Sequence, residues 1–109
     1  MDCEEEFTPS QLIELLKTVK IEIVPRKVNM DFIYESGATI DEVYDCIRHL
    51  EERHLNEGPV DDDDKTRKGK IYIFHTTFIE KHWVYVKVKV KLDELSNKFI
   101  AVISFHNCL

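Results

Sequence analysis

The sequence predicts an α+β fold, in which N-terminal helices pack on a C-terminal antiparallel sheet of three consecutive strands. Two patterns predict it. Apolar side chains recur at helical spacing through the first half of the chain, whereas residues 82–92 alternate strictly between apolar and polar side chains. The chain has 109 residues, of which 43% are hydrophobic, so we expect a single domain, residues 1–109, around one core.

A capping box begins the first predicted helix. Thr8 can accept a hydrogen bond from the backbone of Gln11, whose side chain can return one, and Pro9 suits the first helical turn. The helix is predicted over about residues 9–19, with its apolar side formed by Leu12, Leu15, Leu16 and Val19. Residues 21–25 alternate and end at a proline, which indicates a short strand or extended segment.

Two further helices follow. The second is predicted over 27–36, ended by Gly37 in the left-handed conformation that glycine favours. Thr39 and Glu42 form another capping box, which begins a third helix that runs to about Arg53. The side chains expected to face the core are Val28, Phe32 and Ile33 from the second helix, and Ile40, Val43, Tyr44, Ile47 and Leu50 from the third.

The region after the third helix has no periodicity. Residues 54–69 contain four consecutive aspartates followed by basic residues, and we interpret them as a mobile loop that buries nothing. Three strands follow, over residues 70–79, 82–92 and 98–106. Because short links join antiparallel neighbours, these strands are expected to form a meander with one face against the helices and one in solvent.

The middle strand gives the two faces different chemistry. Val84, Val86, Val88 and Val90 are expected to be buried, and the opposite, solvent-facing side carries Trp83, Tyr85, Lys87, Lys89 and Lys91. Aromatic rings and ammonium groups about 7 Å apart suit the unstacked bases and phosphates of single-stranded RNA. The same pattern is typical of a solvated strand whose lysines prevent aggregation, and both interpretations stay open.

Histidine is the side chain best suited to proton transfer near neutral pH. Strict alternation along the last strand places His106 on one face with Ser104, Val102 and Ile100. His75 and His82 flank the first link between strands. Each is a candidate acid or base beside a basic surface, although a lone histidine is more often an ordinary surface or partly buried residue.

Charge is distributed unevenly along the chain, whose net charge is −6. Residues 1–64 hold 6 Lys or Arg against 18 Asp or Glu, whereas residues 65–109 hold 9 against 3. A basic face in the second half could bind phosphates, or the two halves could attract each other within the fold. Charge alone does not choose between them.

The cysteines indicate a reducing compartment. Cys3, Cys46 and Cys108 are odd in number and widely spaced, so no disulfide framework is expected, and Cys46 is interpreted as a small buried apolar residue. Cys46, His49 and His54 lack a fourth ligand, and neither a metal nor a cofactor is expected. No apolar run approaches the ~20 residues of a membrane span, so the protein is expected to be cytoplasmic, without a membrane partner.

Three stretches carry a family resemblance: RKVNMDFIYESGATIDEVYDCIRHL, WVYVKVKV and IAVISFH. They resemble the MqsR family of bacterial and archaeal toxins, over residues 26–107 and most specifically at Val84–Lys87 and Val102–Phe105. Members of that family are small ribonucleases with a RelE-like fold that cut mRNA without a metal and are silenced by an antitoxin. The resemblance implies a RelE-like fold here, with mRNA and a cognate antitoxin protein as partners.

The resemblance also implies site residues. Tyr85 falls on the family's active-site tyrosine, His106 on its catalytic lysine and Tyr72 on its active-site glutamine. The implied mechanism is attack of the ribose 2′-OH on the adjacent phosphate, with His106 as acid or base and Tyr85 orienting the substrate or moving a proton. These two must then meet on the exposed face of the sheet. The residues that would hold RNA are Trp83, Lys87, Lys89, Arg67 and Lys68.

The sequence thus predicts a toxin of a toxin–antitoxin system that acts as an endoribonuclease. The alternative is a non-catalytic module of the same fold that holds an acidic protein partner or RNA on its basic sheet face. The RNA sequence preference and the oligomeric state, including a possible homo-oligomer, stay open.

Overall fold

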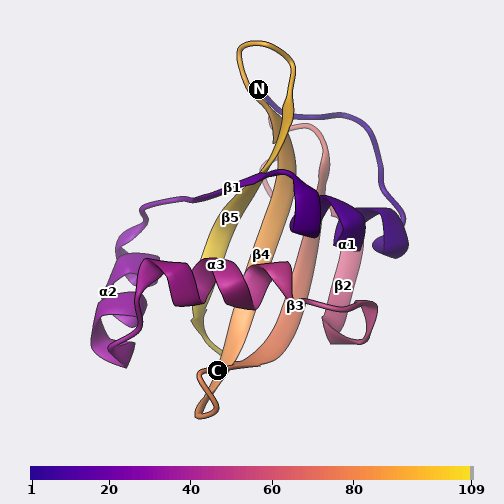
Figure 1. Cartoon of the computed structure of the whole chain (residues 1–109). Coiled ribbons are helices and arrows are strands. Elements are labelled where there is room, and N and C mark those ends of the chain that lie inside the picture. The colour runs from indigo at the N-terminus through magenta and orange to yellow at the C-terminus, as the bar shows by residue number, and fades with distance from the viewer. Residues whose placement is uncertain (109) are drawn as a thin grey trace.

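Three helices and a five-stranded mixed sheet make up the fold (Figure 1). The computed structural model describes residues 1–108. The helices are α1 (Pro9–Thr18), α2 (Lys27–Ser36) and α3 (Ile40–Arg48), followed by a 3₁₀ turn, η1 (Glu52–His54). The strands are β1 (Lys20–Ile23), β2 (Leu55–Asp61), β3 (Lys70–Phe78), β4 (His82–Leu92) and β5 (Lys98–Asn107). The α+β prediction is confirmed, and within the described residues no helix is long and apolar enough to cross a membrane.

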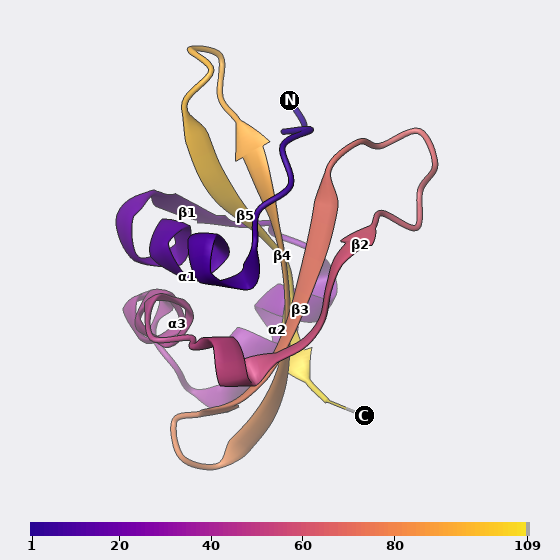
Figure 2. The ribbon, with the colours of Figure 1, turned by 90° about the vertical axis from the view of Figure 1, so that its right-hand side faces the viewer.

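The sheet has one face under helices and one face without them. Its strand order is β1-β5-β4-β3-β2, with β1 parallel to β5 and the other neighbours antiparallel. α1 and α3 lie on the same side, and no helix of residues 1–108 covers the opposite side, which we call the open face (Figure 2). The predicted meander of β3, β4 and β5 is confirmed as the centre of the sheet, but the prediction did not pair β1 and β2 with its edges.

The helix ends follow the predicted signals. Thr8 Oγ1 accepts from the Gln11 N–H at 3.2 Å, and the Thr8 N–H donates to Gln11 Oε1 at 2.9 Å. Thr39 and Glu42 make the same two bonds at 3.2 and 2.9 Å. Gly37 ends α2 with φ at 75°, as its place in the sequence predicts.

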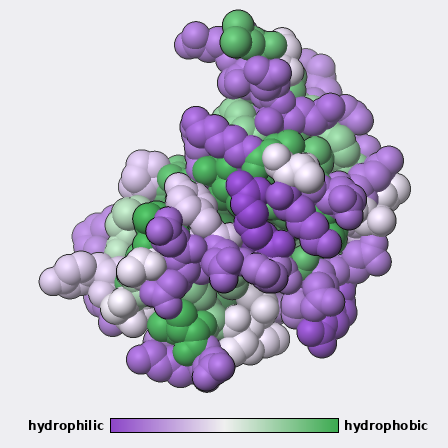
Figure 3. All heavy atoms as spheres, in the orientation of Figure 1, coloured by the Kyte–Doolittle hydropathy of each residue, from purple (hydrophilic) through white to green (hydrophobic). Residues whose placement is uncertain are grey.

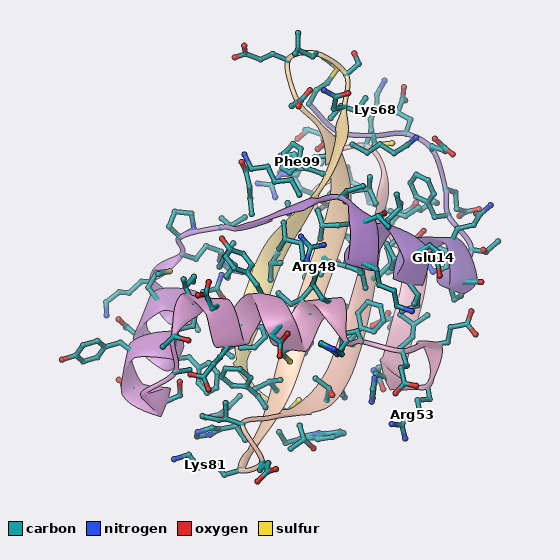
Figure 4. The ribbon with its side chains drawn as sticks, viewed as in Figure 1. Glu14, Arg48, Arg53, Lys68, Lys81 and Phe99 are labelled. Carbon is teal, nitrogen blue, oxygen red and sulfur yellow. The ribbon has the colours of Figure 1, made fainter. Side chains whose placement is uncertain are left out.

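α3 is shorter than predicted, because it ends at Arg48 rather than near Arg53. The chain then turns through η1 into β2 and leaves the helical path. Arg48 extends from α3 towards α1 (Figure 4), where its Nη1 donates to the carbonyl oxygens of Leu16 and Val19 at 2.9 Å each. These carbonyls lie at the end of α1 and lack helical partners, so Arg48 satisfies them and ties the two helices together.

The core lies between the helices and the sheet. The four valines of β4 are at most 3% exposed, as predicted, and they pack in one cluster with residues that include Leu12, Leu16, Val43, Ile47, Phe74 and Phe105. Val28 and Ile40, predicted to face inward, are instead 41% and 42% exposed. Both lie in the first turn of a helix, and in α2 the inward position is taken by Asn29. Seen from the helical side, the surface is largely hydrophilic except for apolar groups such as the tip of the β4–β5 hairpin (Figure 3).

The prediction of an irregular loop over residues 54–69 is wrong for its first half. Residues 55–61 form β2, which pairs antiparallel with β3 and closes one edge of the sheet. Two register shifts interrupt that pairing, so the strand bends and its side chains do not alternate regularly. Because residues 55–61 lack a period of two, their sequence does not indicate a strand.

Beyond Val102, β5 has no neighbouring strand on the β1 side, and α2 provides the hydrogen-bond partners there instead. β1 pairs with β5 only as far as Val102, and Ile103, the next residue, has no partner on β4, which makes it a β-bulge. Asn29, fully buried on α2, donates to the Ile103 carbonyl and accepts from the Phe105 N–H, both at 2.9 Å. It also donates to the Val24 carbonyl at 2.9 Å, so one side chain completes the edge of the sheet.

We expect Asn29→Ala to lower the free energy of unfolding by about 3 kcal/mol, because it leaves the Phe105 N–H without a partner and removes one hydrogen bond from each of the Val24 and Ile103 carbonyls. Chemical denaturation measures the loss. Met30→Ala, at the exposed neighbouring position, is the control and should change stability by much less. Equal effects of the two variants would contradict the role assigned to Asn29.

Candidate functional site

Two histidines flank one tyrosine across the open face. In the sheet register, His75 of β3 lies opposite Tyr85 of β4, which lies opposite His106 of β5. The Tyr85 and His106 rings stack with centroids 5.3 Å apart and an interplanar angle of 13°. The His75 centroid is 5.8 Å from that of Tyr85, and Trp83, 54% exposed, adds a fourth ring 6.1 Å from His75. We call His75, Tyr85 and His106 the His–Tyr–His row.

The expected meeting of Tyr85 and His106 is confirmed, but the predicted neighbours of His106 are only partly right. Ser104 shares its face, whereas Val102 and Ile100 are fully buried in the core. The β5 bulge between them shifts the alternation by one residue. Strict alternation would have turned His106 towards the helices.

A hydrogen bond determines which nitrogen of His106 carries a proton, and burial and nearby charges shift the pKa of Tyr85. His106 Nδ1 lies 3.0 Å from the carbonyl oxygen of Asn107, which only accepts, so Nδ1 carries the proton and Nε2 keeps its lone pair in the neutral ring. Burial, together with the nearby carboxylates of Glu57 and Asp63, raises the pKa of Tyr85 above its usual 10.0. Tyr85 therefore carries its hydroxyl proton at neutral pH, with its ring stacked on that of His106.

A groove of about 690 Å³ lies beside the row on the same face. Cations and carboxylates both line it: Arg26, Arg67, Lys87, Lys89 and Lys91, and Asp2, Asp62, Asp63 and Asp64. We call it the charged groove. Lys87 connects it to the row, because it lies two residues from Tyr85 on the same face of β4 and opposite Ser104 of β5.

Lys89 is buried under the charged groove, and the prediction that it faces solvent and holds RNA is wrong. Its side chain is 3% exposed, and its Nζ lies 3.0 Å from Asp62 Oδ2 and 3.4 Å from Asp2 Oδ1. Asp62 is itself buried, so the expectation that the aspartates bury nothing is also wrong. Two carboxylates neutralise the ammonium group where it would otherwise meet a phosphate, so Lys89 stabilises the fold instead.

The acidic half of the chain pairs with the basic half throughout this region. Ion pairs at 2.6 to 3.9 Å join Asp2 to Lys89 and Lys91, Glu4 to Lys68, Glu5 to Lys98, Glu6 to Lys70, Asp61 to Lys70, Asp62 to Lys89 and Asp64 to Arg67. Most of them are exposed and contribute little each. They show that many of the acidic side chains of the first half pair with basic side chains of the second half within the fold.

The remaining predicted RNA-binding residues differ in position. Lys87 is half-buried and has no carboxylate within 4 Å among residues 1–108. Arg67 lines the charged groove but pairs with Asp64 at 3.5 Å. Lys68 pairs with Glu4 at 3.4 Å outside that groove, so the structure does not bring it to the His–Tyr–His row.

Two other candidate positions lie away from the open face. Tyr72 is 1% exposed on the core side, and its hydroxyl donates to the Phe7 carbonyl at 2.6 Å and accepts from the Phe7 N–H at 3.0 Å. It therefore cannot replace the family's glutamine. Cys46 is half-buried on α3, where burial raises the pKa of its thiol to about 11. Over residues 1–108, no three His, Cys, Asp or Glu side chains group as they would around a metal ion.

Sequence reasoning missed the position of His75 and the contacts of Arg26. His75 and Tyr85 are equally far from residue 80 in the β3–β4 turn, so locating that turn would have paired them. Arg26 Nη1 donates to the Ile103 carbonyl and to Ser104 Oγ, both at 2.9 Å. Those partners lie 77 and 78 residues further along the chain, so no local sequence pattern indicates these contacts.

No protein-family model matches the chain, and neither a curated protein nor a solved structure matches it. The resemblance to MqsR toxins and the RelE-like fold therefore remain predictions. The candidate site stands on its own geometry.

We expect Asp62→Asn to lower the free energy of unfolding by about 3 kcal/mol at neutral pH, because it leaves the buried Lys89 with only the more distant Asp2. Adding Lys89→Met should recover part of the loss, since the second change removes the unpaired charge. Denaturant titration of the two variants and the parent measures both steps. Additive losses in the double variant would show that the pair does not interact.

The effect of Asp62→Asn should disappear in acid. Burial raises the pKa of Asp62, but hydrogen bonds from the Asp64 backbone N–H and from Lys89 outweigh it, so the pKa lies below its usual 3.8. A carboxylate with a lowered pKa stabilises the fold fully above the usual value, and this is lost as pH falls through the folded value. Unfolding curves of parent and variant should therefore converge as pH falls below about 4.

Glu57→Gln should lower the pKa of Tyr85 towards its usual value, because the carboxylate of Glu57 disfavours the charged phenolate. A pH titration of the Tyr85 ring resonances by NMR measures the shift. Glu14→Gln on α1 is the matched control and should leave Tyr85 unchanged. A Tyr85 titration unaffected by Glu57→Gln would remove Glu57 from the electrostatics of the row.

Proposed function

We propose that this protein is a ribonuclease that binds single-stranded RNA on the open face and cleaves it at the His–Tyr–His row. The register that aligns His75, Tyr85 and His106 is the observation that carries the proposal. Cleavage by the neighbouring 2′-OH needs a base, an acid and a hydrogen-bond donor for the phosphoryl oxygens. Two imidazoles on either side of a phenol supply all three on an accessible surface.

The reaction assigns one role to each ring. His106 takes the 2′-OH proton at Nε2, and the 2′-oxygen forms a bond to phosphorus as the bond from phosphorus to the 5′-oxygen breaks. His75, protonated and on the far side of Tyr85, gives a proton to the leaving 5′-oxygen. Tyr85 donates to a non-bridging oxygen, consistent with its raised pKa. The products are a 2′,3′-cyclic phosphate and a 5′-hydroxyl, and no step requires a metal.

Lys87 and Trp83 are placed to hold the strand around the row. Lys87 offers an ammonium group two residues from Tyr85, and Trp83 offers an exposed ring on the other side. A base stacked on an indole contributes about 1–3 kcal/mol to binding. RNA that contacts both side chains therefore runs along β4, with a phosphate over Tyr85.

The resemblance to MqsR toxins supports a biological setting for this activity. In that setting the protein acts on mRNA in the cytoplasm as the toxin of a toxin–antitoxin pair, and a cognate antitoxin silences it. The three free cysteines, Cys3, Cys46 and Cys108, agree with a reducing compartment.

The test compares cleavage of an RNA oligonucleotide with that of the same strand carrying 2′-deoxyribose at the cut site, with EDTA present. We expect only the first to be cut. His106→Ala and His75→Ala should each slow cutting by about 10²–10⁴-fold, since each removes a proton-transfer group. His49→Ala, an exposed histidine on the other side of the fold, should cut like the parent.

Two outcomes would overturn the proposal. Equal cutting of both strands would exclude attack by the 2′-OH. RNA that the parent protein binds but never cuts would instead support the alternative, a non-catalytic binding module.

A further inference from the structure

Arg26 presents an unused hydrogen-bonding edge towards the open face. A guanidinium group has five N–H donors, two of them on Nη1. Both Nη1 donors of Arg26 are engaged, one by the Ile103 carbonyl and one by Ser104 Oγ, each at 2.9 Å. The Nε–H and the Nη2 donors remain, and Nε with Nη2 forms the parallel pair that binds two oxygens of one phosphate.

The surroundings fix this edge in place and leave it without a counter-charge. The Ile103 carbonyl that anchors Arg26 is released by the β5 bulge and is also held by Asn29. Among residues 1–108, no carboxylate lies within salt-bridge distance of Arg26. The guanidinium is thus pre-oriented by neutral partners, which leaves its charge available to a ligand.

Lys87 lies on the other side of the same serine. Ser104, which Arg26 contacts, pairs across the sheet with Lys87, and both cations line the charged groove. Ser104 also precedes His106 by two residues on the open face, so the two cations lie next to the His–Tyr–His row. The other groove cations, Arg67, Lys89 and Lys91, are all paired with aspartates.

We propose that Arg26 and Lys87 form a phosphate-binding site for the RNA backbone, in which Arg26 binds two oxygens of one phosphodiester through Nε and Nη2 and Lys87 pairs with the same group. The site rests on the proposed binding of RNA but not on its cleavage. It places a phosphate of the strand beside Tyr85 and His106, and it explains why these two cations of the groove lack an internal carboxylate.

The experiment measures binding of an RNA oligonucleotide that carries 2′-O-methyl groups throughout, which 2′-OH attack cannot cut. Arg26→Lys keeps the charge but loses the planar edge, and we expect it to weaken binding about tenfold with nearly unchanged salt dependence. Lys87→Ala should weaken binding and also reduce the salt slope of log K by roughly 0.7, because one phosphate contact is lost.

Matched controls repeat the same chemical changes outside the groove. Arg53→Lys in η1 and Lys81→Ala at the β3–β4 turn, both labelled in Figure 4, should bind like the parent. A second measurement needs no variant: the Nε–H resonance of Arg26 in the parent protein should shift when inorganic phosphate is added at constant ionic strength. Thermal unfolding shows whether Arg26→Lys, which alters a contact to β5, remains folded at the assay temperature.

The outcomes separate this site from the proposed enzyme. Equal binding by the parent and a folded Arg26→Lys, or an Arg26 resonance that phosphate leaves unmoved, would overturn the phosphate site even if RNA is cut. Weakened binding by Arg26→Lys together with a shifted resonance would support the site even if the parent cuts no RNA.

Discussion

The hydrogen bonds between Asn29 and the edge of β5 are the constraint on which the rest of the structure depends. They replace a missing strand, satisfy the carbonyl that the bulge at Ile103 frees, and fix α2 against the sheet. Because side chains alternate along a strand, one extra residue decides the face of every residue beyond it. Phe105 therefore enters the core and His106 reaches the open face beside Tyr85.

The same bulge links stability to the candidate chemistry. It directs the Ile103 carbonyl towards α2, where it orients Arg26 as well as Asn29. A regular strand would have kept that carbonyl in the sheet and left Arg26 without its anchor. The proposed catalytic row and the proposed phosphate site thus share one irregularity of the backbone, which is typical of bulges near functional sites.

Ion pairs within the chain determine which charges the open face presents to a ligand. Asp62 and Asp2 neutralise Lys89, and Asp2 also pairs with Lys91. Among residues 1–108, Lys87 is thus the one lysine of this row without a carboxylate partner. Buried pairs of this kind are costly to break because one partner is then left charged and unsolvated. A ligand therefore meets a small cationic area made of Arg26 and Lys87 rather than a broad basic stripe, which favours contact with a single phosphate.

The sequence by itself determined the local structure. Capping residues such as Thr8 and Thr39, the glycine at position 37 and the alternation of β4 each act within a few residues, so they predicted the helices, the buried valines and the open-face positions of Tyr85 and Lys87. Only the tertiary structure decided the burial of Lys89, the pairing of β2, the face of His106 and the anchoring of Arg26. Each of these depends on a partner far away in the chain. The residues next to a side chain in the sequence do not indicate which distant group will neutralise its charge, or where a bulge will shift the register of its strand.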